Sequence, residues 1–181
     1  MNAEKFERTP LGHTPKGVPV VAAAGVVGVG AGPGGFAAAA WGRREGWGGE
    51  GCSVVLLEKF DMPGGGHTSG LQGAANAGVG GIHTELMQRF DEAGCIYTVT
   101  EKDLPDWAGN ALSHYDYYLP AGSPFSRSSF NPDGAGNVMV NMLEEAGVTA
   151  IYGASFTDVE MEAAGGGRRI THAIYQTVEG R

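Results

Sequence analysis

The chain has 181 residues, of which 42% are apolar and 9% aromatic, and this suffices for one domain with a buried core. Its net charge is −8 and no basic run exceeds two arginines, so neither nucleic acid nor an anionic membrane surface is expected as a partner. No uninterrupted apolar run reaches the roughly 18 residues of a membrane span, which we therefore exclude.

The first 17 residues are polar, contain two prolines and show no periodicity, which predicts a disordered leader. Residues 18–181 are expected to form one domain. The apolar run at 18–29 also fits a secretory signal peptide, but cleavage there would remove the first strand. Cys52 and Cys95 lack metal-ligand spacing and favour a reducing compartment, so we expect a cytoplasmic protein without a bound metal.

Residues 26–58 have the order strand, glycine turn, helix, strand and acid that is typical of dinucleotide sites. Gly30 permits the tight turn, Gly32 lets a diphosphate approach the backbone, and Gly35 lets the helix pack closely on the sheet. Pro33 suits the first helical turn, and Gly34 follows it at the helix end whose free N–H groups attract an anion. A helix is predicted from residue 34 or 35 to about 45.

Glu58 ends the second predicted strand, residues 53–57, about twenty residues after the last glycine of the turn. A carboxylate at this place accepts hydrogen bonds from both ribose hydroxyls and repels a 2′-phosphate. The sequence therefore predicts FAD or NAD as the ligand, and not NADP.

Three strings resemble the N-terminal part of the FAD-dependent oxidoreductases related to the flavoproteins of succinate dehydrogenase and fumarate reductase: GAGPGGFAAA at 30–39, VVLLEKF at 54–60 and GGGHTSGL at 64–71. The resemblance implies FAD as cofactor, with Lys59 among its contacts. Flavoproteins of this kind are expected to be about twice as long or more. We therefore expect a fragment or a truncated gene product.

The glycine loop at 61–70 follows the acid directly, and in the resembling family such a loop runs under the flavin. The resemblance thereby implies Gly65, Gly66 and Thr68 as cofactor contacts. His67 stands in a string similar to the segment that attaches FAD covalently in succinate dehydrogenase flavoproteins, although it lies further from Glu58 than in that group. Covalent attachment, a non-covalent flavin contact and a plain loop histidine all remain open.

The remaining elements follow from periodicity and capping signals. Apolar spacing predicts an amphipathic helix at 82–93, and residues 95–129 suggest an irregular excursion where substrate contacts begin. Asn131 caps a helix that stops at Gly147, and residues 148–152 form a third parallel strand. Residues 155–161 and 169–178 form a β-hairpin over the sheet. The resemblance implies that the backbone near Phe156 contacts the adenine.

We therefore expect an α/β fold, a doubly wound parallel sheet of the Rossmann-like FAD-binding type with a β-hairpin crossover. The expected function is that of the flavin-binding portion of an oxidoreductase, which accepts a hydride from a small-molecule substrate. The alternatives are an NAD-dependent dehydrogenase and a non-catalytic nucleotide-binding fragment. No catalytic residue, substrate or electron acceptor is assigned from the sequence.

Overall fold

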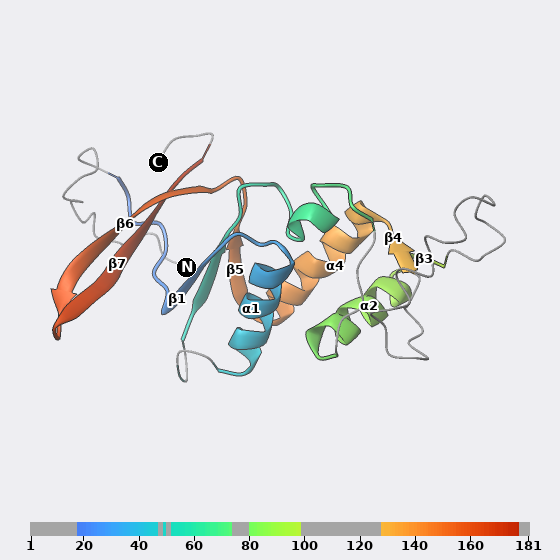
Figure 1. Cartoon of the computed structure of the whole chain (residues 1–181), viewed down its shortest axis with the longest axis horizontal. Helices are drawn as coiled ribbons and strands as arrows, with labels where there is room; N and C mark the ends of the chain where they lie inside the picture. Colours follow the sequence, from blue (N-terminus) through green and yellow to red (C-terminus); the bar gives the residue numbers. More distant parts are fainter. Residues whose placement is uncertain (1–17, 47–48, 50–51, 74–79, 99–127, 178–181) are drawn as a thin grey trace.

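The computed structural model describes residues 18–46, 49, 52–73, 80–98 and 128–177 as a mixed α/β fold (Figure 1). The predicted leader at 1–17 and residues 99–127 of the predicted excursion lie outside the described residues. Within the described ranges, no helix has the length and apolar character that crossing a membrane requires.

Three strands form the parallel sheet: β1 (Val26–Val29), β2 (Val54–Leu57) and β5 (Val148–Ile151), in the order β1-β2-β5. Val26 lies opposite Val54, which in turn lies opposite Val148. All four residues of β2 are buried, as expected of a parallel strand that has a neighbour on each side. The prediction of three parallel strands is confirmed, and their carboxyl ends share one edge of the sheet.

Helices α1 (Pro33–Arg44) and α4 (Pro132–Glu145) pack on one face of this sheet (Figure 1). Side chains of β2 alternate, so Val54 and Leu56 join the core beneath the two helices. The oxygen Oδ1 of Asn131 accepts hydrogen bonds from the amides of Asp133 and Gly134, which confirms the predicted cap.

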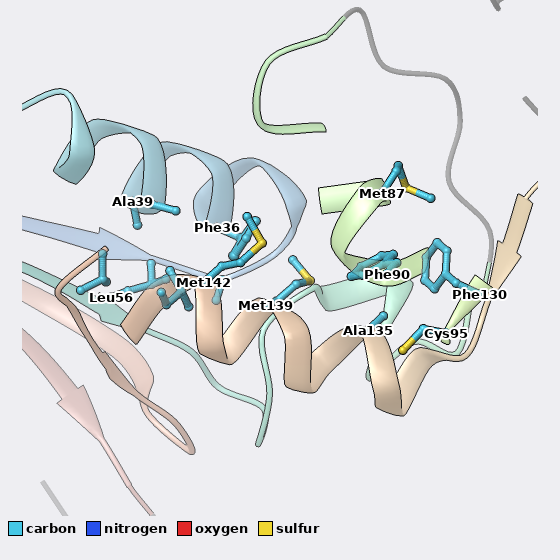
Figure 2. Close-up of a cluster of buried hydrophobic side chains, with 14 of the residues drawn as sticks. Phe36, Ala39, Leu56, Met87, Phe90, Cys95, Phe130, Ala135, Met139 and Met142 are labelled. Atoms are coloured by element: carbon cyan, nitrogen blue, oxygen red, sulfur yellow. The ribbon is translucent and has the colours of Figure 1, made fainter. Parts of the chain in front are cut away.

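Helix α2 (Ile82–Glu92) extends the core beyond the sheet, next to α4. Figure 2 shows a continuous cluster from Leu56 of the sheet to Phe90 of α2 and Phe130. The antiparallel strands β3 (Ile96–Thr98) and β4 (Ser128–Phe130) close this end. The two strands lie at the two ends of residues 95–129, the stretch that was expected to be irregular. Their pairing was not predicted, because strands so far apart in sequence leave no local pattern that indicates that they pair.

The opposite face of the sheet carries the hairpin of β6 (Ser155–Ala164) and β7 (Gly167–Gln176). Tyr175 of β7 packs with Val55 and Leu57, which point away from the helices. Both turn glycines, Gly165 and Gly166, have positive φ, as a tight two-residue hairpin turn requires. The strands run closer to the turn than predicted because pairing continues as far as Ala164 opposite Gly167. In the described part of the chain, helices therefore cover one face of the sheet and a hairpin faces the other.

Candidate nucleotide site

The glycine turn and the acid lie together at the carboxyl ends of β1 and β2. Gly30 has a φ of +86°, and its amide donates to the carbonyl oxygen of Leu57 over 2.7 Å. This bond fixes the turn to the end of the neighbouring strand. Crevices at this edge of a parallel sheet are the usual ligand sites of open α/β folds.

Two glycines of the turn differ in what a side chain would meet at their positions. A Cβ atom on Gly35 would overlap the carbonyl oxygen of Gly30, so only glycine lets α1 approach the turn this closely. A Cβ atom on Gly32 would meet no protein atom within 4 Å. The space in front of Gly32 is therefore open to a ligand, and the turn has the shape of a diphosphate cradle.

Helix α1 directs its positive end at this space. Pro33 occupies the first helical turn beside Gly34, no side chain caps the helix, and no acidic residue lies in its first turn. The amide of Phe36 already donates to the carbonyl oxygen of Gly32 over 2.8 Å. The N–H groups before it have no acceptor within a regular helix, which suits an anion placed at this end.

Glu58 is the buried acid of the site, with 4% of its surface exposed. Its Oε2 accepts a hydrogen bond from the amide of Ala31 over 2.5 Å, and its Oε1 accepts one from the amide of Phe60 over 2.9 Å. The Glu58 backbone donates to Ile151 and accepts from Ala154. Each carboxylate oxygen keeps a second lone pair, so Glu58 orients the loop and retains capacity for a ligand hydroxyl.

A pocket of about 430 Å³ opens between the glycine turn, the acid and the start of β6. Six of the predicted site residues line it: Gly30, Gly32, Glu58, Lys59, Gly65 and Phe156. Sequence reasoning missed Phe60, which also lines the pocket and is 44% exposed. An aromatic residue two positions after the strand-ending acid was the available signal, because a solvent-facing turn seldom needs a phenylalanine.

The second glycine loop packs against the first. The amide of Gly64 donates to the carbonyl oxygen of Ala31 over 2.7 Å, and a Cβ on Gly65 would lie 3.1 Å from Cα of Gly32. Residues Gly65–His67 form one 3-10 turn. Thr68 is buried, and its hydroxyl donates to the carbonyl oxygen of Pro63 over 2.6 Å. This hydroxyl therefore stabilises its own loop.

Gly66, His67 and Thr68 do not line the 430 Å³ pocket. His67 and Thr68 instead border a separate, mostly apolar pocket of about 110 Å³ under α1. The His67 ring meets Phe130 edge to face, with centroids 5.9 Å apart, and its Nδ1 is buried without a hydrogen-bond partner. Of the twelve predicted site residues, six thus line the 430 Å³ pocket, Pro33, His67 and Thr68 border the 110 Å³ pocket, and Gly34, Gly35 and Gly66 line neither. Among the described residues, no cluster of three or more His, Cys, Asp or Glu side chains has metal-site geometry.

The model of one protein family, described as FAD dependent oxidoreductase, matches residues 25–181. No curated protein sequence matches the chain. The family match covers the glycine turn, the acid and the strands of all three sheets in the described part of the chain.

One of the solved structures described here shares the fold at low sequence identity, and the other two are similar to a lesser degree. The myxobacterial chondrochloren halogenase CndH, an FAD-dependent halogenase, is 18% identical with a TM-score of 0.52, over 86% of this chain and 33% of that one. THI4 of Thermovibrio ammonificans is 15% identical with a TM-score of 0.45, over 85% and 48%. The L-amino acid deaminase of Proteus vulgaris is 19% identical with a TM-score of 0.46, over 87% and 44%. The chain therefore spans less than half the length of each of these proteins.

Proposed function

Because the chain belongs to the family of FAD-dependent oxidoreductases, we propose that it is the FAD-binding portion of an enzyme that oxidises a small organic substrate by hydride transfer to the flavin. FAD is the cofactor that this family uses. The family also decides between the two cofactors that the glycine turn and the acid leave open, in favour of FAD over NAD.

One observation carries the assignment of the site: a single pocket is lined by both the glycine turn and Glu58. We place the diphosphate at Gly32 and the helix end formed by Pro33, Gly34 and Gly35. The ribose then meets Glu58, whose remaining lone pairs accept its hydroxyls. The adenine lies toward Lys59 and the backbone at Phe156, where β6 begins.

The second glycine loop is proposed to lie under the flavin half of the cofactor. Gly65 lines the pocket and touches the first turn, and Gly66, His67 and Thr68 follow it along the chain. His67 borders the separate 110 Å³ pocket, so its proposed role at this end of the cofactor rests on the resemblance of its sequence string. Covalent linkage through His67 and a non-covalent contact are distinguished by whether the flavin survives denaturation.

In this proposal, the residues of the chain bind FAD and hold it in a fixed orientation. The bound flavin supplies the hydride-accepting chemistry, and the fold supplies a fixed diphosphate cradle and a carboxylate that excludes a 2′-phosphate. The substrate is proposed to bind outside the nucleotide pocket, at contacts that the sequence prediction assigns to residues 95–129. We also propose that the three parallel strands belong to a doubly wound sheet, and that the protein is cytoplasmic.

A second candidate is a nucleotide-binding portion without turnover of its own. It is favoured by one observation, namely that the chain spans 33% of the FAD-dependent halogenase CndH, which it resembles in fold. In this case FAD binds but no substrate reduces it.

A titration of the flavin-free chain tests the proposal. FAD should bind one per chain with quenching of flavin fluorescence, whereas FMN, which lacks the adenosine half, should bind at least about tenfold more weakly because it loses the bonds to Glu58. NADP should bind more weakly than NAD, since the acid repels its 2′-phosphate. Equal affinity for FAD and FMN, or no binding of FAD, would overturn the assignment of this pocket.

A further inference from the structure

We propose that the chain has a second ligand site, a pocket between the parallel sheet and the hairpin that binds an apolar molecule bearing a neutral hydroxyl group. This site, here termed the hairpin pocket, has a volume of about 530 Å³. Its walls are residues 18–24, the sheet face opposite the helices, and residues 171–175 of β7. It shares only Leu57 with the 430 Å³ pocket, so this proposal does not depend on the binding of FAD.

The hairpin pocket exists because short side chains face the sheet. Alternate residues of the segment before β1 are half-buried, among them Ala22 and Ala24, which pack with Val55 and Leu57. Side chains as short as these leave much of the sheet face uncovered. Protein interiors contain few voids larger than a water molecule, whereas a volume of this size is in the range of small-molecule sites.

The lining of the hairpin pocket favours an apolar ligand. Most of its side chains are aliphatic, and two of them, Val21 and Val27, are 53% and 42% exposed. Apolar side chains that remain exposed around one concave site gain free energy when a ligand covers them. The body of the ligand should therefore be a hydrocarbon.

A histidine of fixed tautomer gives the hairpin pocket a polar group. Nδ1 of His172 lies 3.5 Å from Oε2 of Glu160 and 3.2 Å from the hydroxyl oxygen of Thr171. That hydroxyl donates its proton to the carbonyl oxygen of Glu160 over 3.3 Å, so it offers only lone pairs to the ring. Both neighbours of Nδ1 are therefore acceptors, and Nδ1 carries the proton. In the neutral ring, Nε2 is then an acceptor that is left to a ligand.

An acceptor in the wall of a pocket selects a ligand that can donate a hydrogen bond. A hydroxyl group donates to Nε2 of His172, whereas an ether oxygen has no proton to donate. A carboxylate would bring a second negative charge toward the Glu160 carboxylate behind the ring, in a chain whose net charge is already −8. The hairpin pocket should therefore prefer an alcohol to an ether of the same length and to a fatty acid.

The first test compares three ligands on the wild-type chain at about pH 8, where imidazole is ordinarily neutral. Displacement of the neutral dye N-phenyl-1-naphthylamine measures the affinities of 1-decanol, 1-methoxynonane and decanoate. We expect 1-decanol to bind roughly fivefold more tightly than 1-methoxynonane, which lacks the donated hydrogen bond, and decanoate to bind most weakly. Equal affinities for the alcohol and the ether, tighter binding of decanoate, or no binding of 1-decanol would overturn the proposal.

The second test removes the acceptor. His172→Phe keeps a ring in the wall and should lower the affinity for 1-decanol to that for 1-methoxynonane, without changing the affinity for the ether. Ile170→Ala is the control and should bind both as wild type does, because Ile170 is 61% exposed on the same strand and does not line the hairpin pocket. An equal loss for both ligands in His172→Phe would overturn the role of Nε2. If this variant does not fold, the comparison of ligands on the wild-type chain still decides.

A competition with FAD separates the two pockets. Excess FAD should leave the dye bound, and displacement of the dye by FAD would overturn the assignment of a second site. A chain that binds 1-decanol but takes up no FAD would leave the hairpin pocket intact while the proposed function fails.

Discussion

The backbone amide of Ala31 donates a hydrogen bond to Oε2 of Glu58, with the two atoms 2.5 Å apart. These residues are 27 positions apart and belong to adjacent strand ends. The bond makes the acid part of the architecture of the glycine turn, in addition to its expected contact with a ribose. Changes at Glu58 should therefore alter both the stability of the fold and the affinity for FAD.

Replacing Glu58 by alanine leaves the buried amide of Ala31 and the partly buried amide of Phe60 without their acceptor. We expect Glu58→Ala to lower the free energy of unfolding by about 1–3 kcal/mol and the FAD affinity by at least about tenfold. Glu58→Gln keeps one acceptor oxygen and should lie between wild type and alanine. Urea unfolding and FAD titration measure the two effects, with Glu162→Ala on the exposed hairpin as control. Wild-type affinity in Glu58→Ala would contradict a cofactor contact.

Gly35 and Gly34 form a matched pair in the first turn of α1. Gly35→Ala should destabilise the fold by about 1–3 kcal/mol, because its Cβ would overlap the carbonyl oxygen of Gly30. Gly34→Ala meets no protein atom within 4 Å and should be neutral or slightly stabilising, since alanine is the better helix former. Thermal or urea unfolding measures the stability of both variants. Similar stabilities would show that α1 does not pack closely against the turn at Gly30.

The Asn131 cap holds the start of α4, which carries buried residues of the core. Asn131→Ala should cost about 1 kcal/mol in the free energy of unfolding, because two amides lose their side-chain acceptor. Asn131→Asp keeps that acceptor and should restore most of the stability. Urea unfolding curves of the two variants are the measurement, and equal destabilisation would argue against the cap.

Glu85 of α2 joins Arg44 of α1 and Arg89 in a surface network. The hydrogen bond from Arg44 lowers the pKa of the Glu85 carboxyl below its ordinary value of 4.5. A lowered pKa stabilises the fold above pH 4.5, and this contribution is lost as the pH falls through the pKa of the folded state. Glu85→Gln should therefore cost about 0.5 kcal/mol at pH 7 and progressively less below pH 4.5. Unfolding curves at a series of pH values test this, and a difference independent of pH would contradict it.

Local sequence signals predicted most of the elements that build the site. The apolar run, the glycines and the alanine-rich stretch gave the order of β1, α1 and β2, and α1 begins one residue before the expected start because Pro33 already has helical geometry. Asn131 and Gly147 marked the ends of α4 because capping and a positive φ depend on residue type. Such features are encoded within a few residues.

Contacts between distant segments could not be predicted in the same way. The bond from Ala31 to Glu58 depends on where one carboxylate oxygen points once two strands are adjacent. The β3–β4 pair joins segments on either side of a long connection. The separation of His67 from the 430 Å³ pocket likewise follows from how the second glycine loop folds back on the first. These relationships arise from tertiary packing, for which the sequence has no periodic signal.

The visible absorption spectrum of the purified chain, followed by acid precipitation, tests the central claim most directly. We predict a flavin band in the native protein, or one that appears after FAD is added and the excess removed. Release of the flavin into the acid supernatant would indicate non-covalent binding, whereas colour retained in the pellet and lost in His67→Ala would indicate attachment through His67. A folded, colourless chain that takes up no added FAD would contradict the account.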